Sequence, residues 1–173
     1  MSSLHFTPIT PAEAREVLTW RYPGLPTLYN PLPDELENDI EVLLTPAYNY
    51  FAARSAQGLL VGFCCYGSDA QVPGGDYSLR NAIDVGLGMN PQLSGRGLSH
   101  PFLAAILDWG RCCFVPDFFR ATVAAINGRS PVSYTHLRAH ETVLDLVCRL
   151  LLEKKKNNHT YNFIRVTQEL PNQ

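Results

Sequence analysis

Two glycines separated by one residue, Gly95 and Gly97, carry the clearest chemical signal in this 173-residue sequence. They lie in the stretch Gln92-Leu93-Ser94-Gly95-Arg96-Gly97-Leu98. A loop of this kind can direct several backbone N–H groups at one point, and residues without side chains let an anion approach the backbone closely. A helix that begins directly after the loop adds the positive end of its dipole. The stretch is therefore a candidate cradle for a pyrophosphate.

The neighbouring residues predict the elements that position this loop. From 83 to 89, apolar side chains alternate with small or polar ones, which predicts a strand with one packed face. Pro91 cannot donate to a strand ladder and ends the strand. After Gly97, apolar residues recur at helical spacing, so a helix should begin near the second glycine. An ordinary strand-to-helix turn would use glycines for their dihedrals in the same way, and the glycine pair alone leaves both interpretations open.

The stretch Gln92-Leu93-Ser94-Gly95-Arg96-Gly97 resembles the Gln/Arg-x-x-Gly-x-Gly/Ala acetyl-CoA signature of the GNAT superfamily of N-acetyltransferases, with the same placement between a strand and a helix. The resemblance covers roughly residues 4 to 130 and looks like one bacterial branch of the superfamily. It implies an α+β fold, a three-layer α/β/α-like sandwich built on a mixed, mostly antiparallel sheet. It rests also on Trp20-Arg21-Tyr22-Pro23, Tyr29-Asn30, Gly62-Phe63, Asp84 to Pro91 and Phe119 to Ala124.

The resemblance implies acetyl-CoA as a co-substrate and suggests which residues bind it. The strand around Leu87 to Met89 would pair with the pantetheine arm and offer an N–H to the thioester carbonyl, while N–H groups from Leu93 to Leu98 would hold the phosphates. Arg96 could add a charged contact or be a solvated loop residue, and Asn127 could contact the arm or cap a turn. The predicted cofactor-binding residues are Leu87, Gly88, Met89, Gln92, Leu93, Ser94, Gly95, Arg96, Gly97, Leu98, Asn127 and Ser130.

The catalytic groups are harder to place. Asp84 lies on the small-residue face of the central strand, where this family often carries an acid, and it is the candidate general base. The competing interpretation is a strand-end carboxylate paired with an arginine such as Arg80. Tyr134 follows Asn127 by seven residues, the spacing of the family's usual acid tyrosine.

The first two helices and their linker line the acceptor site in this superfamily. Tyr22, Tyr29 and Asn30 are therefore the predicted substrate-binding residues, whereas core packing is the stronger expectation for Trp20. Nothing in the sequence names the amine.

Composition sets the broad class of protein. The content of 46% apolar and 17% charged residues predicts one globular domain over residues 1–173. A formal charge of −2 predicts no nucleic-acid or membrane surface. Five cysteines without metal spacing predict free thiols, no metal and a cytoplasmic location, with the adjacent pairs Cys64-Cys65 and Cys112-Cys113 as small core residues. A homodimer is compatible with the sequence.

The predicted elements follow in the order β-α-α-β-β-β-α-β. An edge strand spans 4 to 9, and Thr10-Pro11-Ala12-Glu13 predicts a capped helix that runs to Trp20. A second helix runs from about Pro33 to Leu44. We expect further strands at 50 to 53, 58 to 66, 83 to 89 and 120 to 125, with a final strand within 160 to 170.

Residues 132 to 156 do not resemble the rest of a native chain. Ser133 to Glu141 can be encoded by a transposase-end sequencing adapter, and Leu146 to Glu153, followed by an A-run for Lys154 to Lys156, by the adapter's second part. The competing interpretation is a genuine amphipathic helix with a basic C-terminal end. We favour a translated adapter, because the Gly-Phe turn expected from the family resemblance is missing here.

Together, these observations predict an acetyl-CoA-dependent N-acetyltransferase that moves an acetyl group to a primary amine of a small molecule or peptide. Direct attack in a ternary complex is the expected route. The alternatives are a non-catalytic acyl-CoA-binding or sensing module, and an inactive chimeric version of an acetyltransferase.

Overall fold

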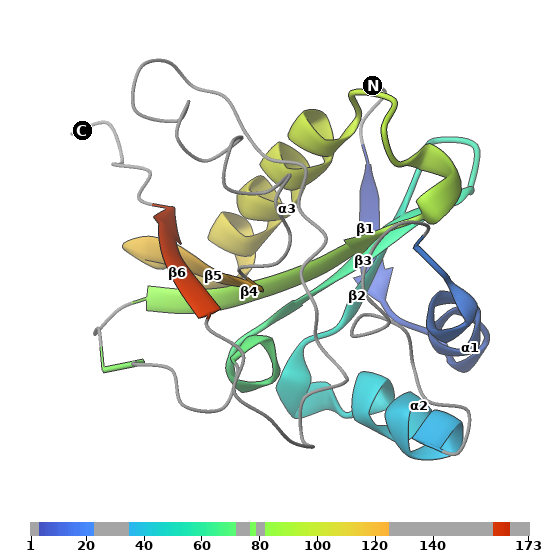
Figure 1. The fold of residues 1–173 in the computed structure, drawn as a ribbon, viewed down its shortest axis with the longest axis horizontal. Helices are drawn as coiled ribbons and strands as arrows, with labels where there is room; N and C mark the ends of the chain where they lie inside the picture. The colour runs from blue at the N-terminus through green and yellow to red at the C-terminus, as the bar shows by residue number, and fades with distance from the viewer. Residues whose placement is uncertain (1–3, 23–34, 72–76, 79–81, 125–160, 167–173) are drawn as a thin grey trace.

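The computed structural model describes residues 4–22, 35–71, 77–78, 82–124 and 161–166. The adapter-like segment 132–156 lies outside these residues. Figure 1 shows the elements in chain order. They are β1 His5–Pro8, α1 Pro11–Thr19, α2 Leu36–Leu44, η3 Pro46–Tyr48, β2 Phe51–Arg54, β3 Leu60–Tyr66, η4 Ser68–Ala70, β4 Ala82–Met89, η5 Pro91–Leu93, α3 Ser99–Phe114, β5 Phe118–Ala124 and β6 Tyr161–Val166, the η elements being short 3-10 turns.

Six strands form one sheet in the order β1-β2-β3-β4-β5-β6. Every neighbouring pair is antiparallel except β4 and β5, which are parallel and joined through α3. The predicted edge strand β1 pairs only with β2 in the described sheet. The mixed, mostly antiparallel sheet expected from the sequence is confirmed.

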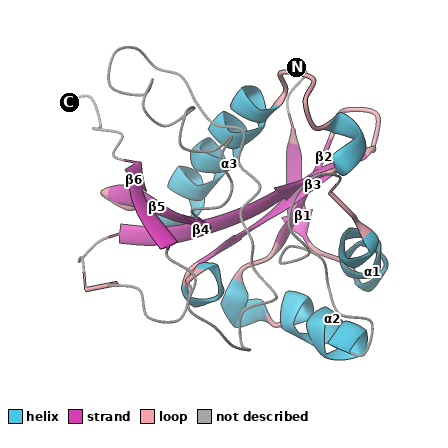
Figure 2. Ribbon diagram, in the orientation of Figure 1, coloured by secondary structure: helices cyan, strands magenta, loops and turns pink. Residues whose placement is uncertain are grey.

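Helices cover both faces of the sheet, α3 on one side and α1 with α2 on the other (Figure 2). The period-two pattern of β4 produces this arrangement, because Val85, Leu87 and Met89 all join the core beneath α3. The core on the opposite face contains α1 and α2 side chains together with Ala52 and Cys65 of the sheet. The predicted three-layer sandwich is therefore confirmed.

The start of α1 matches its sequence signal. The Thr10 side chain accepts a hydrogen bond from the Glu13 N–H at 3.4 Å, and the Glu13 carboxylate accepts one from the Thr10 N–H at 2.9 Å. This reciprocal capping box satisfies two N–H groups that the helix itself cannot pair. It fixes where the chain leaves β1 and enters the layer below the sheet.

A buried tyrosine ties α3 to the sheet. The Tyr66 hydroxyl of β3 donates to the Ile106 carbonyl of α3 at 2.7 Å, and burial raises its pKa well above the usual value. A Cβ atom added at Gly110 would lie 2.7 Å from the Tyr66 ring and 2.8 Å from the Phe119 ring. The helix therefore packs closely on β3 and β5, which sets the direction of its N-terminus.

The cysteine pairs differ in their environments. Cys64 and Cys65 are fully buried, as predicted, and burial raises the pKa of the Cys64 thiol to about 12. Cys112 and Cys113 are exposed, so the prediction that they are core residues is wrong. The reason is their position beyond Gly110, the last buried residue of α3. All four described thiols are free.

The described residues lack two further features. No helix in the described part of the chain is both long and apolar enough to cross a membrane. Within the same ranges, no group of three or more His, Cys, Asp or Glu side chains could hold a metal ion.

Candidate active site

Both glycines of the predicted cradle have left-handed backbone conformations. The φ angle is +75° at Gly95 and +70° at Gly97. Such values are costly for residues with a side chain, which explains the glycines. No atom lies within 4 Å of the place where a Cβ would stand at either residue, so the space beside both glycines is open. The dihedral requirement and the open approach that an anion needs are both present.

The helix after the loop begins without a side-chain cap. Leu98 is the N-cap residue and its side chain makes no hydrogen bond, and the first turn of α3 contains no acidic residue. Helix N-termini are usually capped by a side-chain oxygen or by an external acceptor. This end is therefore suited to accept an anion, which would act as the cap.

Three backbone N–H groups at the start of the loop already have hydrogen-bond partners. The Gln92 N–H donates to the Asn90 side chain at 3.0 Å, while the N–H groups of Leu93 and Ser94 donate to the carbonyls of Asn90 and Pro91 at 2.9 and 3.2 Å. These three N–H groups are engaged in the η5 turn, and those of Leu93 and Ser94 belong to the predicted phosphate ligands. The other predicted N–H ligands are those of Gly95 through Leu98, next to the start of α3.

Asn90 is a residue of this turn that the sequence interpretation missed. An asparagine before a proline favours turn initiation, and this signal was present in the sequence. The Asn90 side chain also donates to the Leu60 carbonyl at 3.2 Å, and its N–H donates to the Val61 carbonyl at 2.8 Å. Asn90 therefore anchors the beginning of the loop to the start of β3.

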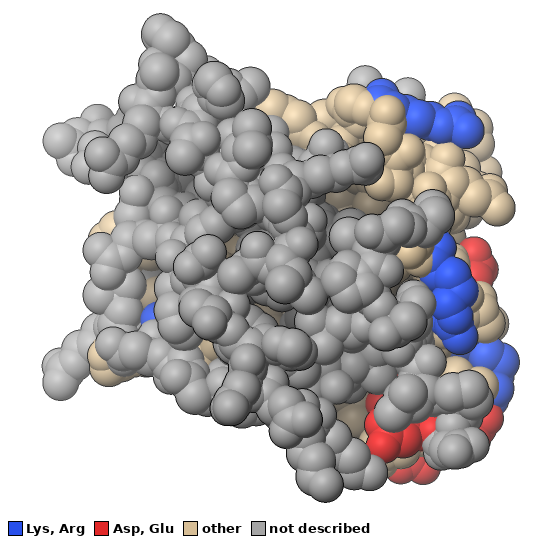
Figure 3. Space-filling view, in the orientation of Figure 1, with Lys and Arg blue, Asp and Glu red and all other residues tan. Residues whose placement is uncertain are grey.

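Arg96 is exposed on the loop between the two glycines. Figure 3 shows Lys or Arg side chains at the upper right edge of the molecule, where Figure 1 places the loop between β4 and α3. Arg96 is the one Lys or Arg between Met89 and Ser99 in the sequence. It lies next to both glycines and could approach a bound phosphate.

Strands β4 and β5 separate part of the way along the sheet. Their ladder has three pairs, Ala82 with Phe118, Ile83 with Phe119 and Asp84 with Arg120. Beyond them, β4 continues beside β3 to Met89, while β5 continues beside β6 to Ala124. We call this region, above the Asp84 and Arg120 pair, the β4–β5 split.

The register of β4 decides which peptide groups face the split. The Asp84 carbonyl accepts from Gly67 N–H and the Asn90 N–H donates to Val61, so both residues direct backbone groups towards the β3 side. Because direction alternates along an antiparallel pair, the peptide groups of Leu87 and Met89 point the other way. Both residues belong to the stretch from Leu87 to Met89 that was predicted to pair with the pantetheine arm.

Gly88, one of the predicted cofactor-binding residues, lies directly opposite Phe63 of β3. By the same alternation, its peptide groups face β3, not the split. A Cβ at Gly88 would lie 2.4 Å from the Phe63 ring. The missing side chain therefore makes room for a neighbouring ring of the protein.

Tyr22 reaches the far end of β4. Its hydroxyl donates to the Met89 carbonyl at 2.9 Å, and burial raises the pKa of this tyrosine. The residue predicted on the acceptor side is thus placed beside the split. Trp20, two residues earlier, is buried against Phe63, as expected for a core residue.

Asp84 is an ion-paired residue at the base of the split. The Arg120 Nε and Nη2 atoms lie 2.5 and 2.8 Å from its two carboxylate oxygens, and Gln71 donates to it at 2.7 Å. The arrangement is the competing interpretation given for this carboxylate, with Arg120 as the partner. Arg80 lies outside the described residues. Both oxygens already accept hydrogen bonds, which makes Asp84 poorly placed to take a proton from an amine.

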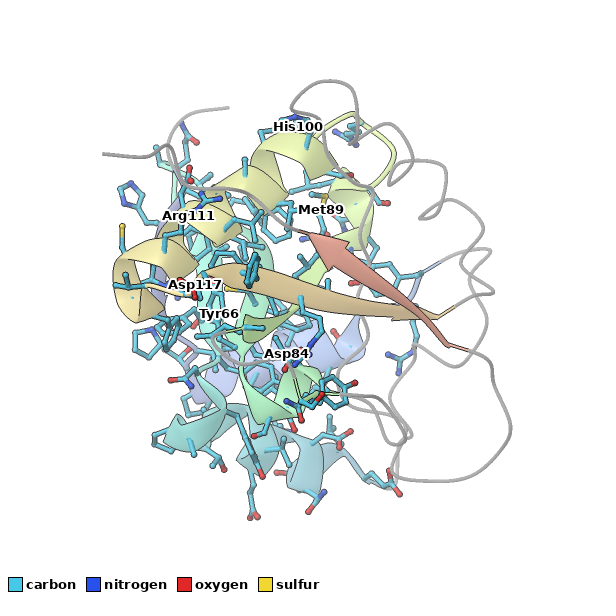
Figure 4. The ribbon with its side chains drawn as sticks, turned by 90° about the vertical axis from the view of Figure 1, so that its left-hand side faces the viewer. Tyr66, Asp84, Met89, His100, Arg111 and Asp117 are labelled. Carbon is cyan, nitrogen blue, oxygen red and sulfur yellow. The ribbon has the colours of Figure 1, made fainter. Side chains whose placement is uncertain are left out.

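Several predicted residues lie outside the described part of the chain. They are the candidate acid Tyr134, the candidate arm contacts Asn127 and Ser130, and the acceptor-side residues Tyr29 and Asn30. Within the described residues, the structure brings Asp84, Leu87, Met89 and Tyr22 together along β4. In Figure 4, Asp84 lies below Met89, and His100 lies above Met89 near the start of α3.

Solved structures share this architecture. A candidate acetyltransferase from Acinetobacter baylyi aligns with a TM-score of 0.62 at 16% identity, over 99% of this chain and 96% of its own. YncA from Salmonella typhimurium, solved with its cofactor acetyl-CoA, gives 0.57 at 15% identity, over 96% and 94%. The spermidine/spermine N-acetyltransferase SpeG from Vibrio cholerae gives 0.56 at 17%, over 94% and 89%.

These likenesses define the fold. The chain has the fold of the GNAT acetyltransferases, as the sequence predicted. No protein-family model matches the sequence, and no curated protein matches it.

Proposed function

We propose that this chain is an acetyl-CoA-dependent N-acetyltransferase that acetylates a primary amine of a small molecule or peptide. The observation that carries the proposal is the loop from β4 to α3, with its two left-handed glycines, open space and a helix start that lacks a side-chain cap. This loop follows β4, whose Leu87 and Met89 peptide groups lie beyond the described β4–β5 ladder. The likeness to the structure of YncA with acetyl-CoA supports this choice of co-substrate.

Each part of the site would have a distinct task. The N–H groups from Gly95 to Leu98 and the α3 dipole would hold the pyrophosphate, with Arg96 as a charged neighbour. The Leu87 and Met89 peptide groups would align the pantetheine arm, and a β4 N–H would polarise the thioester carbonyl. Asn127 and Ser130 stay predicted contacts to the same arm.

The reaction would proceed by direct attack. The nitrogen lone pair of the neutral amine forms the new C–N bond to the acetyl carbon, the C–S bond breaks, and the thiolate leaves with the electron pair. The nitrogen loses a proton and the thiolate gains one. Tyr134 stays the predicted acid. Asp84 stays a predicted base only if its pairing with Arg120 opens, because both of its oxygens are already engaged.

The acceptor is proposed at the level of chemical class. The likeness to SpeG, whose name gives spermidine and spermine as its amines, makes polyamines sensible first probes. Tyr22 stands at the end of β4, where an acceptor-side residue is needed, and Tyr29 and Asn30 follow it in the chain. We also propose a bacterial, cytoplasmic protein that can form a homodimer.

The second candidate is a non-catalytic acyl-CoA-binding or sensing module. The ion pair of Asp84 with Arg120 favours it, because the predicted base is engaged. An inactive chimera, in which residues 132 to 156 replace a native helix, would give neither binding nor turnover.

One pair of measurements separates these functions. Acetyl-CoA should raise the melting temperature of the protein, and free thiol should be released when an amine panel that includes spermidine is added. Thermal stabilisation without thiol release from any amine would support the binding module. Absence of both would refute the proposed function for this chain.

A further inference from the structure

A buried ion pair forms the last rung of the ladder between β4 and β5. Asp84 and Arg120 are register partners, with relative exposures of 3% and 8%. Both carboxylate oxygens are engaged, the Arg120 Nε on one and the Nη2 on the other, at 2.5 and 2.8 Å. Above this rung the two strands belong to separate ladders. The pair therefore stands at the base of the β4–β5 split.

Neighbouring segments hold both members of the pair in place. The Gln71 amide, just after η4, donates to the second oxygen of Asp84 at 2.7 Å. The Tyr77 ring centroid, in the segment before β4, lies 4.6 Å from the central carbon of the Arg120 guanidinium, a cation–π contact. Chain segments before and within β4 thus converge on one bidentate contact with β5.

The energetics of buried ion pairs indicate that this pair fixes geometry more than it adds stability. Two charges removed from water regain little net stability from each other, and apolar residues of similar size often serve stability equally well. What a bidentate arginine–carboxylate contact adds is fixed geometry. Here that geometry is imposed on two strands at the place where they begin to part. An apolar pair would leave their separation less defined.

We propose that Asp84 and Arg120 are positioning residues that lock β4 to β5 at the base of the split. The lock holds the Leu87 and Met89 peptide groups at a fixed distance from β5, so that an extended acyl-thioester arm can lie between the strands. This inference rests on the proposed function for its ligand. It gives Asp84 a role through Arg120 and the strand spacing, in place of proton transfer.

The test compares two ligands that share one end. Acetyl-CoA carries the pantetheine arm, whereas 3′-phospho-ADP, the nucleotide half of coenzyme A, lacks it and reaches only the phosphate cradle. In Asp84→Asn and Arg120→Met, affinity for acetyl-CoA should fall about tenfold, equivalent to one or two lost hydrogen bonds. Affinity for 3′-phospho-ADP should stay within about twofold of the wild type. Titration calorimetry below the melting temperature of every variant gives both constants.

Arg54→Met is the matched control. Arg54 pairs with Glu13, and these side chains are 30% and 9% exposed, in a contact that links β2 to α1 away from the split. Its loss should lower the melting temperature without changing the ratio of the two affinities. A ratio that changes equally in Arg54→Met and Arg120→Met would mean general destabilisation and would overturn the lock.

Two further results would overturn the proposed positioning role of Asp84 and Arg120. An Asp84→Asn variant that binds acetyl-CoA normally but loses turnover, beside an Arg120→Met variant that keeps both, would identify a general base. If the single variants do not fold, the double variant Asp84→Leu/Arg120→Met removes both charges together. Wild-type affinity for acetyl-CoA in that double variant would show that no lock is needed.

A ligand-independent measurement separates this inference from the proposed function. Amide hydrogen exchange in the three-pair β4–β5 ladder should be faster in Arg120→Met than in Arg54→Met, with no ligand present. If wild-type protein binds neither ligand, the proposed function fails while the lock is still judged by exchange. Equal exchange in both variants would refute the lock.

Discussion

Replacing Gly97 with glutamate should abolish the thermal stabilisation of the protein by acetyl-CoA. The new side chain would enter the open space beside the loop and place a carboxylate where the phosphates are proposed to bind. Gly58 offers a matched control in the turn between β2 and β3. It has a similar φ of +82°, against +70° for Gly97, and no atom lies within 4 Å of its missing Cβ.

The backbone cost should be similar at the two sites. A side chain in the left-handed region costs about 1–2 kcal/mol, which for a chain of this length lowers the melting temperature by roughly 2–8 °C. At position 97 the carboxylate also meets the positive end of α3, which can return about 0.3–1 kcal/mol. Without ligand, Gly97→Glu should therefore be no less stable than Gly58→Glu.

The rise in melting temperature on adding acetyl-CoA should distinguish Gly97→Glu from Gly58→Glu. Acetyl-CoA at about 100 times its dissociation constant stabilises the folded state by about 2.7 kcal/mol. This should raise the melting temperature of the wild type by roughly 5–11 °C. Differential scanning fluorimetry should find the same rise in Gly58→Glu and none in Gly97→Glu. A full rise in Gly97→Glu would refute the assignment of this loop as the phosphate cradle.

Three other predictions concern packing, ionisation and the chain itself. Gly110→Ala should lose about 1–3 kcal/mol of unfolding free energy, because the added methyl meets the Tyr66 and Phe119 rings, and an unchanged urea midpoint would contradict this packing. Stability should fall as pH rises from about 9 towards about 12: burial raises the pKa of the folded Cys64 thiol from 9.0 to about 12, so the unfolded chain loses this proton first. The loss is about 1.4 kcal/mol per pH unit for the group, and Cys64→Ala should have a shallower pH dependence in urea unfolding. Long DNA reads prepared without transposase adapters should lack the codons for residues 132 to 156; if those codons persist, the segment is native and Tyr134 can be tested directly as the acid by Tyr134→Phe.

Features encoded by neighbouring residues were predictable from the sequence. Alternation from 83 to 89 gave β4, the Thr10 and Glu13 pair gave the capping box, and the Gly95–Gly97 pair gave the turn into α3. Each rests on residues within a few positions of one another, where dihedral preferences and side-chain period act directly. The family resemblance supplied the order in which these elements assemble.

Features that depend on distant partners were not predictable in the same way. Arg120 lies 36 positions from Asp84, and only the parallel register of β4 and β5 brings the two together. The close fit of Gly88 to Phe63 likewise follows from the β3–β4 register. Sequence spacing says that Gly88 needs no side chain, but not whether a ligand or a ring takes the space.

The β3–β4 and β4–β5 registers predict that amide hydrogen exchange alternates between fast and slow along β4. Amides that face β3, those of Gly86 and Gly88, are shielded by a five-pair antiparallel register, whereas the Leu87 and Met89 amides face the split. Deuterium should therefore enter β4 at alternate positions, fast at 87 and 89 and slow at 86 and 88. A pantetheine arm bound in the β4–β5 split would pair with the Leu87 and Met89 amides as an added strand does. Exchange should then be slow at all four positions from 86 to 89. Within the described residues, half of one central strand is thus an internal sheet edge, the kind of edge that can pair with an added strand.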